Sequence, residues 1–180
     1  MIVATCEAER EWIKAYLGKK CPHIEVTDIK RFFDLSRKGH KDHKDSGEVH
    51  LLYLGRRHPL KGVEYLESAV DELRNSPARP LATPPLLKIV SNAFGEEKEK
   101  VWDWCDVLVL PTLSENFGLV VAEALERGKR VFTTDGAPAW GDGNDYGGRL
   151  VYLKGFRDGS AGDRVLLLKN AIEKLMKKLL

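Results

Sequence analysis

Short apolar runs alternate with segments of helical spacing along most of this chain. The runs are rich in Val, Ile and Leu and end at glycine, proline or a polar residue, which is typical of buried parallel strands. The expected strands are Met1–Thr5, Ile24–Thr27, His50–Gly55, Leu86–Ser91, Val107–Leu110, Lys129–Thr134 and Arg149–Leu153. The expected helices are Glu7–Leu17, Gly62–Arg74, Glu96–Asp103, a helix opened by Gly118, and Arg164–Leu180.

This alternation of strands and helices predicts right-handed βαβ crossovers. The expected fold class is therefore α/β, a Rossmann-like doubly wound and mostly parallel sheet with helices on both faces. Ligands of such sheets bind at the carboxyl ends of the strands. The polar residues that follow strand ends are Arg56, Asn92, Glu115 and Thr134.

The segment Asp106–Leu125 combines a strand, a polar turn and a helix. The first amides of a helix are unpaired and lie at the positive end of its dipole, so this turn is suited to a phosphate. Glu115 and Glu123 bracket the turn, and carboxylates beside an anion site are better suited to accept hydrogen bonds from neutral hydroxyls. A nucleotide-sugar carries both phosphates and hydroxyls.

The letters S-E-N-F-G-L-V-V-A-E-A-L within this segment resemble the E-x7-E element of retaining glycosyltransferases of GT-B architecture, which have two Rossmann-like domains. The resemblance implies that Glu115 faces the donor sugar and that Glu123 holds the nucleotide ribose. It also implies that the intervening amides meet the sugar and the diphosphate. These amides belong to Asn116, Phe117, Gly118, Leu119 and Val120.

A second segment, L-L-Y-L-G-R-R-H-P-L-K-G, resembles the G-R-x-x-x-x-K-G element of the same family and begins its motif at Gly55. Arg56 offers a planar fork to a diphosphate and Lys61 a point charge, so together they would stabilise the leaving nucleotide. The expected reaction therefore needs neither metal nor cofactor, with a nucleoside diphosphate sugar as substrate. Arg57 and His58 are interpreted as surface residues.

The nucleobase is expected beside the stretch Ser91–Gly95, because in the family the backbone near the corresponding strand end holds the base. The donor-binding residues assigned there are Asn92, Ala93 and Phe94. Family members usually have a further strand-helix unit before this segment, where this chain has a short proline-rich connector at Pro77–Pro85. The base and the sugar are therefore left open.

Composition narrows the choice of partners and compartment. Lys and Arg total 29 against 27 Asp and Glu, a net charge of +2, and no aromatic-basic stripe is present, so nucleic acid is not expected as a partner. The three cysteines lack any C-x-x-C spacing, which argues against a disulfide framework and a zinc site. His40 and His43 are assigned no function. The polar start and the lack of a long apolar stretch predict a soluble cytoplasmic protein.

Two further segments keep alternative interpretations. The glycine-rich loop Gly136–Gly148 is expected to close over donor or acceptor, with Trp140 and Tyr146 either stacking on a sugar or packing beneath the loop. Asp135, just before it, is equally ambiguous. The basic amphipathic helix Arg164–Leu180 is expected to pack on the core, and a peripheral membrane contact at the inner face is the alternative.

We therefore expect residues 1–180 to form a single donor-binding domain of a retaining glycosyltransferase that acts on a carbohydrate or lipid-linked acceptor in polysaccharide synthesis. The acceptor-binding Rossmann-like domain would lie elsewhere in a longer protein or in a separate subunit, and the chain would be inactive without it. Two alternatives remain: a non-catalytic Rossmann-like module that binds nucleotide or protein, and half of a GT-B sugar-nucleotide 2-epimerase. The spacing of Glu115 and Glu123 favours sugar transfer.

Overall fold

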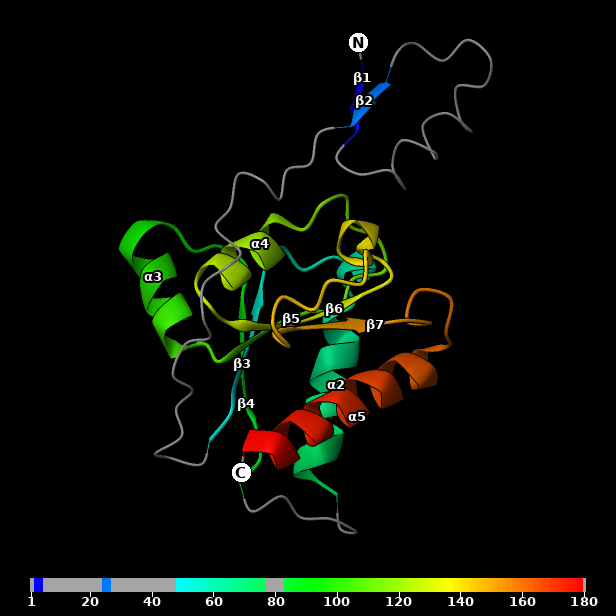
Figure 1. The fold of residues 1–180 in the computed structure, drawn as a ribbon. Helices are drawn as coiled ribbons and strands as arrows, with labels where there is room; N and C mark the ends of the chain where they lie inside the picture. Colours follow the sequence, from blue (N-terminus) through cyan, green and yellow to red (C-terminus); the bar gives the residue numbers. More distant parts are fainter. Residues whose placement is uncertain (1, 5–23, 27–47, 77–82, 180) are drawn as a thin grey trace.

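The protein is described here by a computed structural model that covers residues 2–4, 24–26, 48–76 and 83–179 (Figure 1). The strands are β1 (Ile2–Ala4), β2 (Ile24–Val26), β3 (His50–Leu54), β4 (Leu86–Val90), β5 (Val107–Leu110), β6 (Arg130–Thr134) and β7 (Leu150–Leu153). The α-helices are α2 (Val63–Arg74), α3 (Gly95–Trp104), α4 (Leu119–Glu126) and α5 (Ala161–Leu179). Two 3-10 turns, η3 (Pro59–Lys61) and η4 (Pro138–Trp140), are the other helical elements within these described ranges.

Several predictions fall outside the described residues. They concern the helix Glu7–Leu17, the polar loop that holds His40 and His43, and most of the connector Pro77–Pro85. The two short strands before residue 48 are present as predicted. They pair in parallel with each other as a separate two-stranded sheet.

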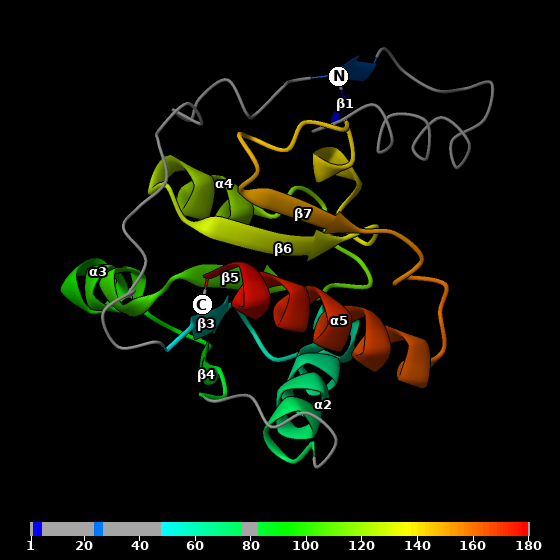
Figure 2. The same ribbon diagram turned by 60° about the horizontal axis from the view of Figure 1, so that its bottom comes forward.

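The main sheet is five-stranded with the order β4-β3-β5-β6-β7, and all its pairings are parallel. The chain first moves outward from β3 to β4, then crosses back to β5 and continues in the opposite direction. Figures 1 and 2 show α2 and α5 together on one face and α4 on the other. The predicted doubly wound α/β fold is therefore confirmed, with its switch point between β3 and β5.

The centre of the sheet forms the hydrophobic core. Strands β3 and β5 are buried along their whole length, because each has a neighbouring strand on both sides and a helix layer on both faces. Strand β4 lies at an edge, and each of its residues is exposed or half-buried. The helix layer with α4 is reinforced by ion pairs from α3, such as Arg127 to Glu99 at 2.8 Å.

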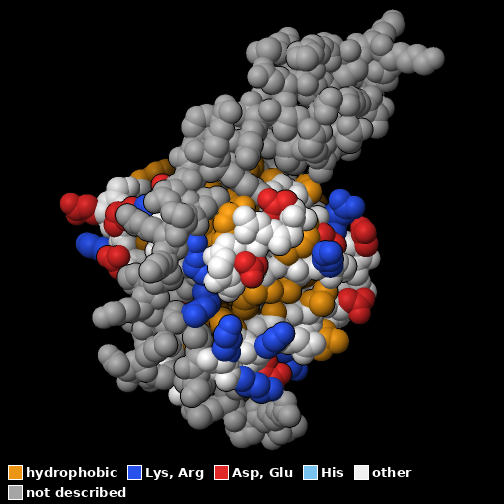
Figure 3. All heavy atoms as spheres, viewed as in Figure 1, with side chains coloured by type: hydrophobic (Ala, Val, Ile, Leu, Met, Phe, Trp, Pro, Cys, Tyr) orange, Lys and Arg blue, Asp and Glu red, His pale blue; other side chains and the backbone are white. Residues whose placement is uncertain are grey.

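Helix α5 packs its apolar face against α2 and the core, burying Leu168, Ile172 and Met176. Its lysines lie on the outer side, where Figure 3 shows basic side chains over the lower part of the molecule. The core-packing interpretation of this helix is confirmed, and the apolar face on which a membrane contact would depend is already covered.

The helix also begins earlier than the predicted Arg164. The Ser160 hydroxyl accepts from the Asp163 amide, and the Asp163 carboxylate accepts from the Ser160 amide, forming a capping box.

The turn after β3 is fastened to the loop after β5 by backbone hydrogen bonds. The Leu60 carbonyl accepts from the Leu113 amide at 2.8 Å and from the Thr112 hydroxyl at 3.0 Å. Gly62, which follows, has φ of 60°, and a β-carbon there would lie 2.1 Å from the Pro111 carbonyl oxygen. Glycine at this position allows the start of α2 to touch the end of β5.

Gly62→Ala should therefore destabilise the protein severely. The left-handed backbone costs about 1 to 2 kcal/mol for a non-glycine residue, and the clash with the Pro111 backbone adds about 1 to 3 kcal/mol. The control is Gly155→Ala, where φ is 79° but a β-carbon would meet nothing within 4 Å. Urea unfolding should show a clearly larger loss of free energy at Gly62, and equal losses would contradict this packing.

Candidate functional site

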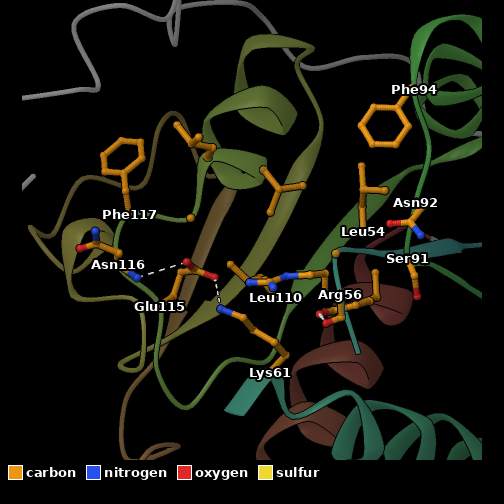
Figure 4. Close-up of a pocket in the computed structure, with 15 residues that line it drawn as sticks. Leu54, Arg56, Lys61, Ser91, Asn92, Phe94, Leu110, Glu115, Asn116 and Phe117 are labelled. Carbon is orange, nitrogen blue, oxygen red and sulfur yellow. Dashed lines mark hydrogen bonds and ion pairs between the residues drawn. The ribbon is translucent and has the colours of Figure 1, made fainter. Parts of the chain in front are cut away.

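A cleft of about 710 Å³ opens at the carboxyl ends of β3, β4 and β5 (Figure 4). It lies at the switch point of the sheet, where the connections leaving β3 and β5 pass to opposite faces and leave a crevice between them. Its lining residues are Tyr53, Leu54, Gly55, Arg56, Lys61, Ser91, Asn92, Phe94, Leu110, Glu115, Asn116, Phe117, Gly118, Leu119 and Val120. Eleven of the thirteen residues predicted for the donor site are among them.

The two catalytic candidates Lys61 and Glu115 form an ion pair across the cleft, with Lys61 Nζ 2.6 Å from Glu115 Oε2. The residues are 54 positions apart in the sequence. They meet because the backbone of the Lys61 turn is fastened to the loop that leads to Glu115. Their side chains are 20% and 22% exposed, so each charge is partly shielded from water while facing the cleft.

The Glu115 backbone is held by the end of β6. Its amide donates to the Gly136 carbonyl at 2.8 Å, and the Thr134 hydroxyl donates to the Thr112 carbonyl. A β-carbon on Gly136 would lie 2.1 Å from the Thr112 carbonyl oxygen, so this contact also requires glycine. Thr134, which the sequence placed at the ligand edge, therefore supports the site and is not itself in the lining.

The amino end of α4 faces the cleft, as the motif predicts. Gly118 precedes the helix with φ of 73°, and no side chain caps the helix there. The first intrahelical bond runs from the Val121 amide to the Gly118 carbonyl, which leaves the amides of Leu119 and Val120 ahead of the ladder. These amides and the helix dipole are suited to an anion, and Leu119 and Val120 line the same cleft as Lys61.

The Gly118 turn is fixed from behind by aromatic packing. Phe117 is buried against Trp140, with ring centroids 5.2 Å apart, and the indole nitrogen of Trp140 donates to the Phe117 carbonyl. Trp140 itself is 1% exposed and also contacts the ring of Tyr146. For Trp140, packing beneath the loop is therefore the correct interpretation, and stacking on a sugar is not.

Arg56 lies between the Lys61–Glu115 pair and the Ser91–Asn92 segment (Figure 4). Its side chain is exposed, and among the described residues its guanidinium forms no ion pair. Since Lys61 and Glu115 compensate each other, Arg56 is the one uncompensated charge among the lining residues of the described cleft. A diphosphate entering the cleft would meet net positive charge.

The loop after β4 forms the other wall. Asn92 is exposed toward the cleft, and Phe94 is 81% exposed at the position before α3. Ala93 between them is 7% exposed and packs into the core, so it does not line the cleft. Its predicted binding role is therefore limited to its backbone.

Glu123 is the other predicted residue outside the lining. It sits one helical turn beyond Leu119, and its Oε2 lies 2.7 Å from Lys98 Nζ of α3. The side chains of Glu123 and Lys98 are 26% and 29% exposed. Lys98 was not predicted as a site residue. The only sequence signal for it is its place in the expected helix Glu96–Asp103, four residues after Phe94. An approach to Glu123 from the cleft requires Lys98 to share or release this carboxylate.

Tyr53 forms part of the cleft floor and was also missed, because a tyrosine within an apolar run looks like a core residue. Its ring is buried and its hydroxyl donates to the Arg56 carbonyl at 2.8 Å, which fixes the turn that carries the guanidinium. Burial of the phenol, and next the negative charge of Glu115, raise the pKa of Tyr53 to about 12.

Other predicted residues lie away from the cleft. Arg57 is exposed and pairs with Glu67, and His58 accepts from the Leu60 amide at the start of η3. Asp135 accepts from the amides of Gly155 and Arg157, so its role is to hold the loop after β7.

Within the described residues no group of three or more His, Cys, Asp or Glu is arranged to hold a metal. No helix in the described part of the chain is long and apolar enough to cross a membrane.

Comparisons with known proteins support the fold. No protein-family model and no curated protein sequence matches the chain. The crystal structure of TarM is similar over 99% of this chain, with a TM-score of 0.55 and 15% sequence identity. At that identity the likeness shows a shared fold, and this chain spans 39% of the TarM chain.

A second solved structure is the C-terminal domain of LpcC, a glycosyl transferase group 1 family protein from Francisella tularensis. It matches with a TM-score of 0.46 and 16% identity over 83% of this chain and 89% of that chain. A TM-score of that size carries no further argument.

The Tyr53 phenol should titrate near pH 12, compared with about 10 for an exposed tyrosine. Because the folded pKa lies above the unfolded one, this group contributes stability below about pH 10 that is lost as the pH rises toward 12. The measurement is the tyrosinate absorbance of the parent minus that of Tyr53→Phe. A difference that titrates near pH 10 would contradict the buried position.

Proposed function

We propose that the chain is the donor-binding domain of a glycosyltransferase of GT-B architecture and that its cleft binds a nucleoside diphosphate sugar. The observation that carries the proposal is the meeting of four features in one cleft. They are the exposed Arg56 guanidinium, the Lys61 ammonium, the Glu115 carboxylate and the amino end of α4. Cations and helix amides suit a diphosphate, and a carboxylate suits sugar hydroxyls.

In the proposed reaction the bond between the sugar and the diphosphate breaks with retention at the sugar carbon. Arg56, Lys61 and the α4 amides take up the negative charge that develops on the departing diphosphate. Glu115 accepts hydrogen bonds from the sugar hydroxyls and orients the ring, while the acceptor hydroxyl supplies the attacking oxygen and releases its proton to the departing diphosphate. Neither a metal nor a covalent nucleophile from this chain takes part.

The nucleoside is proposed to extend along the wall formed by Asn92 and Phe94. Phe94 presents an exposed aromatic face on which a base can lie. The ribose would then point along α4 toward Glu123, whose carboxylate accepts from its hydroxyls once Lys98 shares it.

The acceptor site is proposed to lie on a second Rossmann-like domain that faces this cleft. That domain belongs to a longer protein or to another subunit, and transfer activity requires it. The acceptor would be a carbohydrate or a lipid-linked sugar, in a cytoplasmic enzyme of polysaccharide synthesis.

Removing the uncompensated charge tests the donor site. In calorimetric titrations with UDP, GDP and ADP, Arg56→Ala should weaken the best-bound nucleotide by about 1.5 to 3 kcal/mol, the range of a hydrogen bond to a charged group. Arg57→Ala is the matched control, because Arg57 is the next residue and carries the same charge but pairs with Glu67 outside the lining.

The control should bind like the parent. Equal losses in both variants would indicate only general electrostatic attraction. Failure of the parent protein to bind any of the three nucleotides or their sugar conjugates would reject the donor-site proposal.

A further inference from the structure

In the Lys61–Glu115 ion pair, a carboxylate already binds the lysine that a diphosphate in the cleft would contact. Lys61 Nζ lies 2.6 Å from Glu115 Oε2 and also donates to the Ser114 carbonyl at 3.3 Å. Two of its three protons are therefore directed to acceptors of the protein. A phosphate that binds Lys61 must compete with these acceptors.

We propose that this ion pair makes the cleft select an intact nucleoside diphosphate sugar over the free nucleoside diphosphate. The inference rests on the proposed function and adds a role for Glu115 that sugar orientation does not include. Glu115 acts as a specificity-determining residue that disfavours the nucleotide without its sugar.

The carboxylate cannot simply move away from an incoming phosphate. The Glu115 amide is bound to the Gly136 carbonyl at 2.8 Å, and Oε1 accepts from the Asn116 amide at 3.1 Å. Each carboxylate oxygen thus has a protein donor, and the side chain is held at the cleft wall. A phosphate near Lys61 consequently experiences repulsion from Glu115 at short range.

The two ligands differ in how they meet this carboxylate. A free nucleoside diphosphate ends in an unesterified phosphate that carries additional negative charge near neutral pH, and it has no sugar hydroxyl to offer at that end. The diphosphate of a nucleotide-sugar is esterified on both sides and carries less charge. Its sugar also brings neutral hydroxyls, which donate to the remaining lone pairs of Glu115.

In a reaction cycle, the cleft would consequently bind the nucleoside diphosphate product more weakly than the substrate. Once the sugar has left, the nucleoside diphosphate gains a terminal charge and loses the hydroxyls that satisfied Glu115. The same carboxylate that held the substrate sugar then repels the product, which favours its release.

The test compares Glu115→Gln with the parent protein by calorimetry. Glutamine keeps the size of the side chain and an oxygen for the Asn116 amide but removes the charge. The ligands are UDP, GDP and ADP and the corresponding glucose conjugates, UDP-glucose, GDP-glucose and ADP-glucose. We expect Glu115→Gln to bind the free diphosphate about five- to tenfold more tightly than the parent does, and the sugar conjugate no more tightly.

Glu67→Gln is the matched control, because it removes a carboxylate from the Arg57 ion pair outside the cleft and changes the net charge equally. It should leave both affinities unchanged. Glu115→Ala provides a second variant without the charge, and thermal melting of each variant verifies folding.

If the parent binds a nucleotide but neither Glu115 variant binds the free diphosphate more tightly, this inference is wrong and the donor site stands. If the parent binds none of the six compounds, the proposed function fails and the inference with it.

Discussion

The cleft depends on one backbone contact, the one between the turn Leu60–Gly62 and the loop Pro111–Ser114. Parallel pairing of β3 with β5 brings the ends of these strands together, and Gly62 removes the β-carbon that would keep them apart. The Leu60 carbonyl then accepts from the loop after β5. This contact converts two segments that are distant in sequence into one wall, on which Lys61 and Glu115 meet.

The two motif acids, Glu115 and Glu123, share one feature: each pairs with a lysine from another element. Glu115 is held by Lys61 from the turn before α2, and Glu123 by Lys98 from α3. All four side chains are partly shielded, so an unpaired carboxylate at either place would be costly in the absence of a ligand. The ion pairs stabilise the two carboxylates, and a ligand must supply better partners than the lysines do.

Much of the fold could be predicted, because the strands of the main sheet are short apolar runs with clear ends. The turn from Glu115 to Gly118 also followed from local pattern, since a buried strand, a glycine and a helix occur in fixed order. Contacts across the sheet could not be predicted in the same way. The partner of Glu123 depends on how α3 packs against α4, and nothing near Glu123 in the sequence indicates Lys98.

Tyr53 illustrates the same limit, because its place in an apolar strand gives no sign that its hydroxyl reaches the Arg56 carbonyl. Ala93 lies in the loop to which the resemblance assigns the nucleobase, and its side chain turns into the core, so it offers only its backbone there. The start of α5 was placed too late, because the capping pair Ser160 and Asp163 was not recognised in the sequence. In each case the feature that the sequence did not predict depends on a contact formed by three-dimensional packing or by a single helix cap.

The central claim is that a nucleoside diphosphate sugar binds in the cleft between β3 and β5. Mapping the backbone amide resonances of the isotopically labelled chain during a titration with UDP-glucose, GDP-glucose and ADP-glucose tests it most directly. The account predicts that one of these compounds shifts the amides of Gly55, Arg56, Asn92 and Gly118–Val120, at the carboxyl edge of the sheet. Shifts confined to another surface, such as the groove between α2 and α5, would contradict it, and so would the absence of any shift.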